Sequence, residues 1–235
     1  MSSTRLPGKA LMNLAGYPLL KHVVDRSLAS QTVDQIVLAT SDSSADDVLA
    51  AWAKNAGLVC YRGSEVDVLD RYYGAARACG AKVIARVTAD NPFRDPTVVD
   101  RVVRHLQERE LDFAYNNKPP SFPEGLDTEV FTFAALEEAA NMAQDPFERE
   151  HVTQYFYRHP ERFRQENIAC DRQLSHLRWT IDTAADFLMA EAVYERLYTE
   201  GNIFLMDDIL ALIEVYPEIA AINMGEERSY MHRCA

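Results

Sequence analysis

The sequence has no long apolar run, and this lack excludes the commonest kind of membrane protein. No stretch approaches the ~20 consecutive apolar residues that a membrane-spanning helix needs. The opening M-S-S-T-R-L-P-G-K has no apolar segment after its basic residues, so it does not match a secretory signal. We therefore expect a cytoplasmic protein with no membrane partner.

Cysteines are few and scattered. They stand at Cys60, Cys79, Cys170 and Cys234, and no two form a C-x-x-C pair. Zinc sites space their cysteines closely and regularly, and disulfides belong to oxidising compartments. We expect neither a zinc site nor a disulfide in this chain.

Basic residues are also in short supply. The chain has 24 Lys and Arg against 36 Asp and Glu, and its formal net charge is −12. Because a nucleic-acid-binding surface neutralises phosphates with clustered Lys and Arg, no nucleic-acid partner is expected. An acidic protein can still bind a nucleotide through a local basic loop or a bound metal. The search therefore narrows to cations on a loop and to carboxylates that can hold Mg²⁺.

Short apolar strands alternate with amphipathic helices along the chain. The hydrophobic spacing predicts strands at 36–39, 58–61, 83–87, 112–115, 129–133 and 177–181. It predicts helices at 18–28, 48–56, 68–76, 96–106, 134–143 and 147–158. This order predicts an α/β fold, a Rossmann-like three-layer sandwich with a mostly parallel sheet. The 235 residues fit a single domain.

Two aspartates follow predicted strands. Ligands of such sheets lie beyond the carboxyl ends of the strands, so Asp90 and Asp182 stand where Mg²⁺ ligands are expected. The alternatives are ordinary ones. Asp90 precedes Asn91-Pro92, a common turn sequence. Asp182 could cap a helix, and Thr183 and Asp186 have the spacing of a capping pair.

The segment from Ser3 to Lys9 gathers hydroxyl groups, two cations and a glycine. Gly8 lets the backbone approach a ligand closely, Arg5 can fork onto phosphate oxygens, and Lys9 supplies a compact charge. Ser3 and Thr4 add hydroxyl donors. A phosphate-binding loop and a solvated N-terminal tail both fit this composition.

Two further polar segments are candidates for binding a polar acceptor. One holds Asp127 and Glu129, and the other holds Arg149 and His151. A solvated loop and a charged first helical turn explain them equally well.

Taken together, these segments resemble the cytidylyltransferases of sugar activation, and most of all their spore-coat polysaccharide (SpsF-like) group. The matching motifs are S-T-R-L-P-G-K at 3–9, T-A-D-N-P at 88–92, G-L-D-T-E-V-F at 125–131, E-R-E-H-V-T at 148–153 and L-R-W-T-I-D at 177–182. Family relatives activate acidic sugars such as 3-deoxy-manno-octulosonate and sialic acids. Several motifs in one order are more specific than any one of them.

The resemblance implies Mg²⁺-dependent transfer of CMP from CTP to an acidic sugar, with release of pyrophosphate, for surface polysaccharide or glycoconjugate synthesis. It implies a catalytic set of Arg5, Lys9 and Asp90, a nucleotide-binding loop of Ser3, Thr4, Arg5, Gly8 and Lys9, and Mg²⁺ ligands Asp90 and Asp182. Acceptor recognition is then expected from Asp127, Glu129, Arg149 and His151. Residues 118–175 are expected to form an acceptor-binding or dimerisation insertion, and the protein is expected to be a homodimer.

The family pattern also places a strand and an A-R-M-like turn before the opening loop. Met1 stands at that turn here, so we expect the first strand of the sheet to be missing. Two alternatives stay open: a nucleotidyltransferase that uses another NTP, and a nucleotide-binding protein that is inactive because the first strand is missing. A glycosyltransferase is disfavoured, because it would usually need an Asp-x-Asp motif after a strand, and the chain has none.

Overall fold

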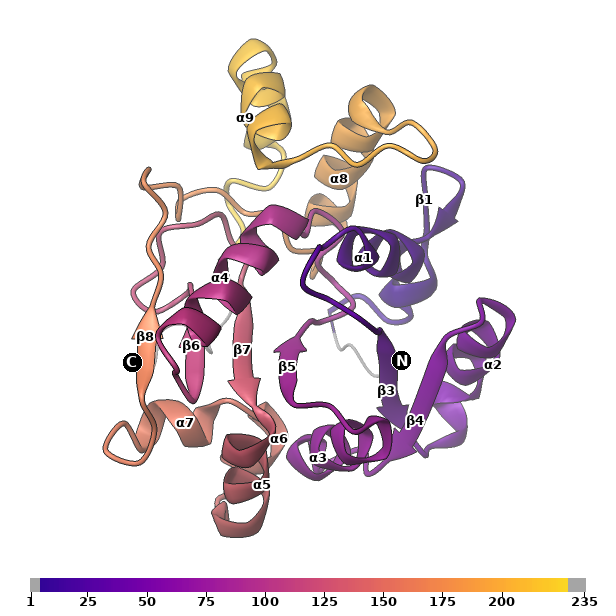
Figure 1. Ribbon diagram of the computed structural model, residues 1–235. Helices are drawn as coiled ribbons and strands as arrows, with labels where there is room; N and C mark the ends of the chain where they lie inside the picture. The colour runs from indigo at the N-terminus through magenta and orange to yellow at the C-terminus, as the bar shows by residue number, and fades with distance from the viewer. Residues whose placement is uncertain (1–4, 228–235) are drawn as a thin grey trace.

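The computed structural model describes residues 5–227 and shows strands and helices in alternation (Figure 1). The strands are β1 (Asn13–Leu14), β2 (Tyr17–Pro18), β3 (Val37–Ser41), β4 (Val59–Gly63), β5 (Val83–Arg86), β6 (Phe113–Tyr115), β7 (Glu129–Thr132) and β8 (Gln165–Asn167). The helices are α1 (Leu19–Leu28), α2 (Asp47–Asn55), α3 (Val68–Cys79), α4 (Pro96–Glu108), α5 (Phe133–Met142), α6 (Pro146–His151), α7 (Gln154–Arg158), α8 (Ala184–Leu197), α9 (Met206–Val215) and α10 (Pro217–Ala221), with short 3₁₀ turns η1 (Lys9–Leu11) and η2 (Ser44–Asp46).

The larger strands form two sheets. β3 pairs with β4 in parallel, and a second sheet has the order β5-β7-β6-β8. In the second sheet β7 runs antiparallel to both β5 and β6, whereas β6 and β8 are parallel. A loop rather than a helix joins β6 to β7, which permits the antiparallel pairing. The α/β fold is therefore confirmed, with mixed sheets.

Side chains from alternate positions of the strands face two helical layers, as a three-layer sandwich requires. On one face Ala114 and Val130 pack against the apolar side of α4. On the other face Phe113 and Phe131 pack against α3, α5 and α7. Figure 1 shows α4 crossing one side of the sheet. No helix within residues 5–227 is long and apolar enough to cross a membrane.

Two sequence-based element predictions need correction. The strand expected at 177–181 is only an isolated parallel bridge between Glu124 and Arg178. The single helix expected at 147–158 is two short helices, because Val152 has φ 52° and ψ −67°, which a helix cannot continue through. Thr183 and Asp186 form the capping box at the start of α8, as their spacing predicts.

Candidate active site

A cavity of about 500 Å³ lies where the loops after β5 and β6 meet the segment before α8. Polar side chains from distant parts of the chain form most of its wall: Arg5, Arg86, Thr88, Asp90, Asn91, Arg94, Asn117, Lys118, Pro119, Pro120, Glu124, Gly125, Asp127, Glu129, Thr153, Gln154, Tyr157, Thr180 and Asp182. Arg5, Asp90, Asp127, Glu129 and Asp182 were all expected at the site from the sequence. The fold therefore gathers candidates from four separate motifs around one cavity.

Lys9 lies between the two aspartates that the sequence singled out as metal ligands. Its ammonium Nζ is 2.7 Å from Asp90 Oδ2 and 2.9 Å from Asp182 Oδ1, and it also donates to the Ile181 carbonyl at 2.8 Å. Gly8, with φ 74°, begins the 3₁₀ turn that carries Lys9. Both carboxylates can thus contact one cation at the same time.

Electrostatics follow from this geometry. Burial alone would lower the pKa of the Lys9 ammonium, but Asp90 and Asp182 outweigh burial and hold that pKa above its ordinary value. Burial would likewise raise the pKa of Asp90, and the charge and hydrogen bond of Lys9 bring it below its usual range. Lys9 and Asp90 are therefore both charged at neutral pH.

Arg178 holds Asp182 from the side away from Lys9. Its Nη2 lies 2.9 Å from Asp182 Oδ2, its Nη1 lies 2.7 Å from Glu124 and its Nε lies 2.9 Å from Asp186. Arg5 adds an ion pair to Asp182 Oδ2 at 3.0 Å. Sequence reasoning missed Arg178, although a charged residue inside an apolar run signals a buried partner.

Arg86 and Glu129 form a second ion pair in the cavity wall, with 2.6 Å between Nη1 and Oε2. Thr153 and Tyr157 donate to the other carboxylate oxygen, both at 2.9 Å. Burial would raise the pKa of Glu129, but Arg86 and these donors lower it. Sequence reasoning expected Glu129 here and missed the other three residues.

Gly125 lets two loops of the site touch. Its φ is 105°, and an added Cβ would lie 2.7 Å from the Thr180 nitrogen and 2.8 Å from the Trp179 carbonyl carbon. Hydrogen bonds on either side, from Trp179 N–H to the Glu124 carbonyl and from Glu124 N–H to the Leu177 carbonyl, tie the loops together. This contact sets the loop of Asp127 against the loop of Asp182.

Two expected acceptor residues lie elsewhere. Arg149 binds Asp67 at 2.7 Å and donates to the carbonyls of Ala140 and Ala143, so it joins α3, α5 and α6. His151 packs its ring against Phe147. Neither lines the cavity. Ser3 and Thr4 lie outside the described residues.

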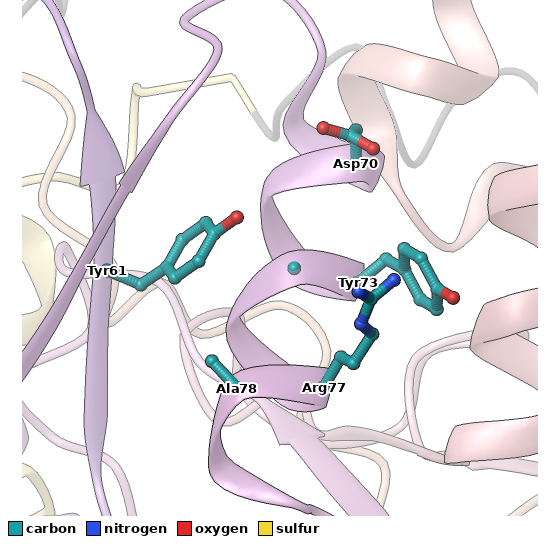
Figure 2. Close-up of a pocket in the computed structure, with 6 residues that line it drawn as sticks. Tyr61, Asp70, Tyr73, Arg77 and Ala78 are labelled. Carbon is teal, nitrogen blue, oxygen red and sulfur yellow. The ribbon is translucent and has the colours of Figure 1, made fainter.

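A separate hollow of about 430 Å³ lies between β4 and α3. Figure 2 shows Tyr61 pointing from β4 toward α3, which carries Asp70, Tyr73 and Arg77. Gly74 makes room for the Tyr61 hydroxyl, which would lie 2.0 Å from an added Cβ. The residues expected at the site that fall within residues 5–227 lie outside this hollow.

Comparison with known proteins gives consistent matches. A family model described as cytidylyltransferase matches residues 1–209. The spore coat polysaccharide biosynthesis protein SpsF of Bacillus subtilis is 32% identical over 227 residues, covering 94% of this chain and 93% of SpsF. A 3-deoxy-manno-octulosonate cytidylyltransferase of Geobacter sulfurreducens is 32% identical over 107 residues, covering 46% of this chain and 42% of that protein. The structure of a cytidylyltransferase from Leptospira borgpetersenii aligns with a TM-score of 0.89 at 28% identity, covering 98% of this chain and 95% of that one.

Proposed function

The chain belongs to the cytidylyltransferase family and is a nucleotidyltransferase, and from that premise we propose that it transfers CMP from CTP to an acidic sugar. The observation that carries the proposal is the pair of carboxylates, Asp90 and Asp182, that shares one cation beside the cavity. Two carboxylates in the wall of a polar cavity, with a cation between them, suit a triphosphate and a hydroxylated acceptor.

On the nucleotide side, Arg5 and Lys9 neutralise the triphosphate and the departing pyrophosphate. Arg5 is about half exposed and pairs with Asp182 through Nη2, and in the proposal its guanidinium also contacts phosphate oxygens. Lys9 follows Gly8 on the 3₁₀ turn and lies within reach of both aspartates. The opening loop, including Ser3 and Thr4, completes this anion site in the proposal.

The donor set fits Mg²⁺. This ion is usually bound by one or two carboxylates together with substrate phosphates, and the Lys9 ammonium stands in for a cation between Asp90 and Asp182. When bound there, Mg²⁺ supplies charge neutralisation on the phosphate being transferred and lowers the pKa of the attacking hydroxyl. Arg178 holds Asp182 in place for this role.

The reaction is an in-line displacement at the α-phosphorus of CTP. An acceptor hydroxyl oxygen forms the new bond to that phosphorus, the bond to the β-phosphate oxygen breaks, and the hydroxyl proton passes to solvent. Such transfers depend on positioning and charge stabilisation more than on covalent catalysis. In this scheme the cavity residue Asp127 contacts the acceptor, and Glu129 lies in the same wall with its oxygens held by other side chains. The product is a CMP-sugar for surface polysaccharide synthesis, made in the cytoplasm, where CTP is supplied.

The first test is nucleotide selection. Thermal unfolding is measured with CTP, UTP, GTP and ATP, each with and without Mg²⁺. A nucleotide at 100 times its dissociation constant stabilises the fold by about 2.7 kcal/mol, which gives a clear shift. We expect the largest shift with CTP and Mg²⁺ together, followed by pyrophosphate release with an acidic sugar. A larger shift with another nucleotide would favour the alternative NTP, and no shift with any would favour an inactive protein.

We also propose that the protein is a homodimer and that residues 118–175 contribute to the contact. Sedimentation equilibrium measures the mass directly against the 26.6 kDa of one chain. A mass of one chain at all concentrations would refute the dimer and leave the catalytic proposal unaffected.

A further inference from the structure

Arg86 is fixed in the cavity wall by its partners. It ends β5 directly opposite Glu129 on β7, and opposite residues of an antiparallel pair have side chains on the same face. Glu129 accepts from Arg86 through one oxygen and from Thr153 and Tyr157 through the other. With both oxygens engaged, the carboxylate cannot turn away, and the plane of the Arg86 guanidinium is set.

The rest of that guanidinium has unused donors. The ion pair uses Nη1, whereas Nε is buried and has no hydrogen-bond partner among residues 5–227. Nη2 likewise makes no hydrogen bond within that range. The side chain of Arg86 is 23% exposed and lines the cavity. Nη2 is therefore the donor left for a ligand, and it can give a charge-assisted hydrogen bond to an oxygen of a carboxylate.

A second guanidinium adds positive potential to the same cavity. Arg94 is only 1% exposed, and it donates to neutral acceptors, the Thr128 hydroxyl at 3.2 Å and the Asp127 carbonyl at 3.0 Å. Burial lowers the pKa of Arg94 to about 10, so the group stays charged at neutral pH. Asp127 and Asp90 attract the charge of Arg94, and Arg86 repels it, so the two guanidiniums stand on the same cavity among these acids.

The backbone before Thr153 is strained. Val152 has φ 52° and ψ −67°, and the Thr153 N–H donates to the His151 carbonyl at 2.5 Å, which makes a γ-turn with positive φ. This turn is rare, and a buried β-branched residue adopts it only under constraint. It ends α6 and presents the Thr153 hydroxyl to Glu129. Strain of this kind is typical of functional sites.

We infer that Arg86 recognises the carboxylate of the acceptor, and that Glu129, Thr153 and Tyr157 are positioning residues that aim it. The inference rests on the proposed function, because it assigns a binding partner to the charged group of the acidic acceptor. Neighbouring hydroxyl and amide groups in the wall suit the hydroxyl groups of a sugar.

The test measures binding and does not depend on turnover. The probes are 3-deoxy-manno-octulosonate and N-acetylneuraminate, each compared with its uncharged methyl ester. Dissociation constants are measured by calorimetry on the full chain, alone and saturated with Mg²⁺ and α,β-methylene-CTP, which cannot release pyrophosphate. The proteins are the wild type, Arg86→Lys, Tyr157→Phe and the control Arg101→Lys. Arg101 is an exposed arginine of α4 that lies outside the cavity.

We expect one acid to bind the wild type at least tenfold more tightly than its ester, since a charged hydrogen bond is worth about tenfold to a hundredfold in affinity. Arg86→Lys should remove most of that difference and leave ester binding unchanged. Tyr157→Phe should reduce the difference, and Arg101→Lys should preserve it. If Arg86→Lys does not fold, as judged by circular dichroism, Tyr157→Phe decides: an unchanged acid preference overturns the inference.

Three other results also overturn the inference. In the first, neither acid binds the wild type at least tenfold more tightly than its ester. In the others, Arg86→Lys keeps the full preference for the acid, or it weakens only the binding of the CTP analogue. The last result would assign Arg86 to a nucleotide phosphate. Pyrophosphate release from CTP is scored separately. Acid binding that depends on Arg86, without pyrophosphate release, would refute the proposed function and leave the inference standing. Pyrophosphate release together with an unchanged acid preference in Arg86→Lys would support the proposed function and overturn the inference.

Discussion

Lys9 and Asp90 are 81 residues apart in the sequence, and their side chains are joined by a 2.7 Å ion pair. Asp182 binds the same ammonium at 2.9 Å. The fold therefore holds the Lys9 ammonium between two carboxylates. If Mg²⁺ were held by Asp90 and Asp182, it would supply the positive charge there, and Lys9 would be released to pair with the triphosphate of CTP.

The first prediction concerns Lys9→Ala. Without the ammonium, Asp90 and Asp182 repel each other, so the nucleotide-free variant should bind Mg²⁺ more tightly than the wild type, as measured by calorimetry. Pyrophosphate release should fall by about 10²- to 10³-fold, because the triphosphate loses a charge that stabilises the transition state. Both effects follow from the same contact.

Lys21→Ala is the matched control for that variant. Lys21 lies on α1 and pairs with Asp25 at a partly exposed position. The Lys21→Ala variant should bind Mg²⁺ and turn over substrate as the wild type does. Weaker Mg²⁺ binding by Lys9→Ala would contradict the exchange of Lys9 for the metal.

The second prediction concerns pH and Glu129. The folded-state pKa of Glu129 lies below its ordinary value of 4.5. A carboxyl with a lowered pKa stabilises the fold fully above its unfolded pKa and loses that contribution as the pH falls through the folded value. Glu129→Gln should therefore lower the free energy of unfolding by roughly 3 kcal/mol at pH 7, and the difference from the wild type should shrink below about pH 4.5.

Urea unfolding of both proteins from pH 3 to pH 8 measures this difference. Glu137→Gln is a useful control, since Glu137 accepts one hydrogen bond, from Tyr73, at an exposed position. A difference that stays constant with pH would show that packing, and not the charge of Glu129, stabilises this part of the fold.

The sequence predicted the gathering of Lys9, Asp90 and Asp182 only through motif resemblance and strand-end placement. Both aspartates follow apolar runs, and the rule that strand ends collect ligands placed them together. It could not show that Lys9 occupies the place between them, because that depends on contacts across 81 and 173 residues. The capping pair of Thr183 and Asp186 could be predicted from local spacing alone, and it is confirmed.

Predictions failed where tertiary contacts outweigh local pattern. The apolar segment at 177–181 looks like a strand, yet its backbone makes only an isolated bridge, at Arg178. The helical pattern at 147–158 is broken at Val152, whose strained turn no composition rule identifies. Arg149 resembled a ligand-binding residue, and the structure uses it to join α3 to α5 and α6.

The third prediction concerns Arg178. Its guanidinium binds Glu124, Asp182 and Asp186, and it is almost fully buried. Arg178→Met removes the cation that these three carboxylates share, although Lys9 and Arg5 still pair with Asp182, and it should lower the free energy of unfolding by roughly 3 to 5 kcal/mol. Arg178→Lys keeps the charge and loses the forked guanidinium, so its free energy of unfolding should lie between those of the wild type and Arg178→Met. Arg172→Lys, at an exposed pair with Asp207, should unfold as the wild type does. Equal stability of Arg178→Met and the wild type would contradict this role.

The last prediction concerns Gly125→Ala. The added methyl would meet the backbone of Trp179 and Thr180 at less than 3 Å, at a φ of 105° that side chains rarely adopt. Overpacking and backbone strain together should lower the free energy of unfolding by roughly 2 to 4 kcal/mol. Because the loops of Asp127 and Asp182 meet at this contact, Mg²⁺ binding should weaken as well.

Gly57→Ala separates the two causes of that effect. Gly57 has φ 70° and no atom within 4 Å of an added Cβ, so alanine there meets only backbone strain. It should lower the free energy of unfolding by about 1 to 2 kcal/mol and leave Mg²⁺ binding unchanged. Equal losses of stability in the two variants, with Mg²⁺ binding retained in both, would mean that the contact between the loops does not position Asp182. A selective loss of Mg²⁺ binding in Gly125→Ala would tie the geometry of the two carboxylates to this one close approach of backbones.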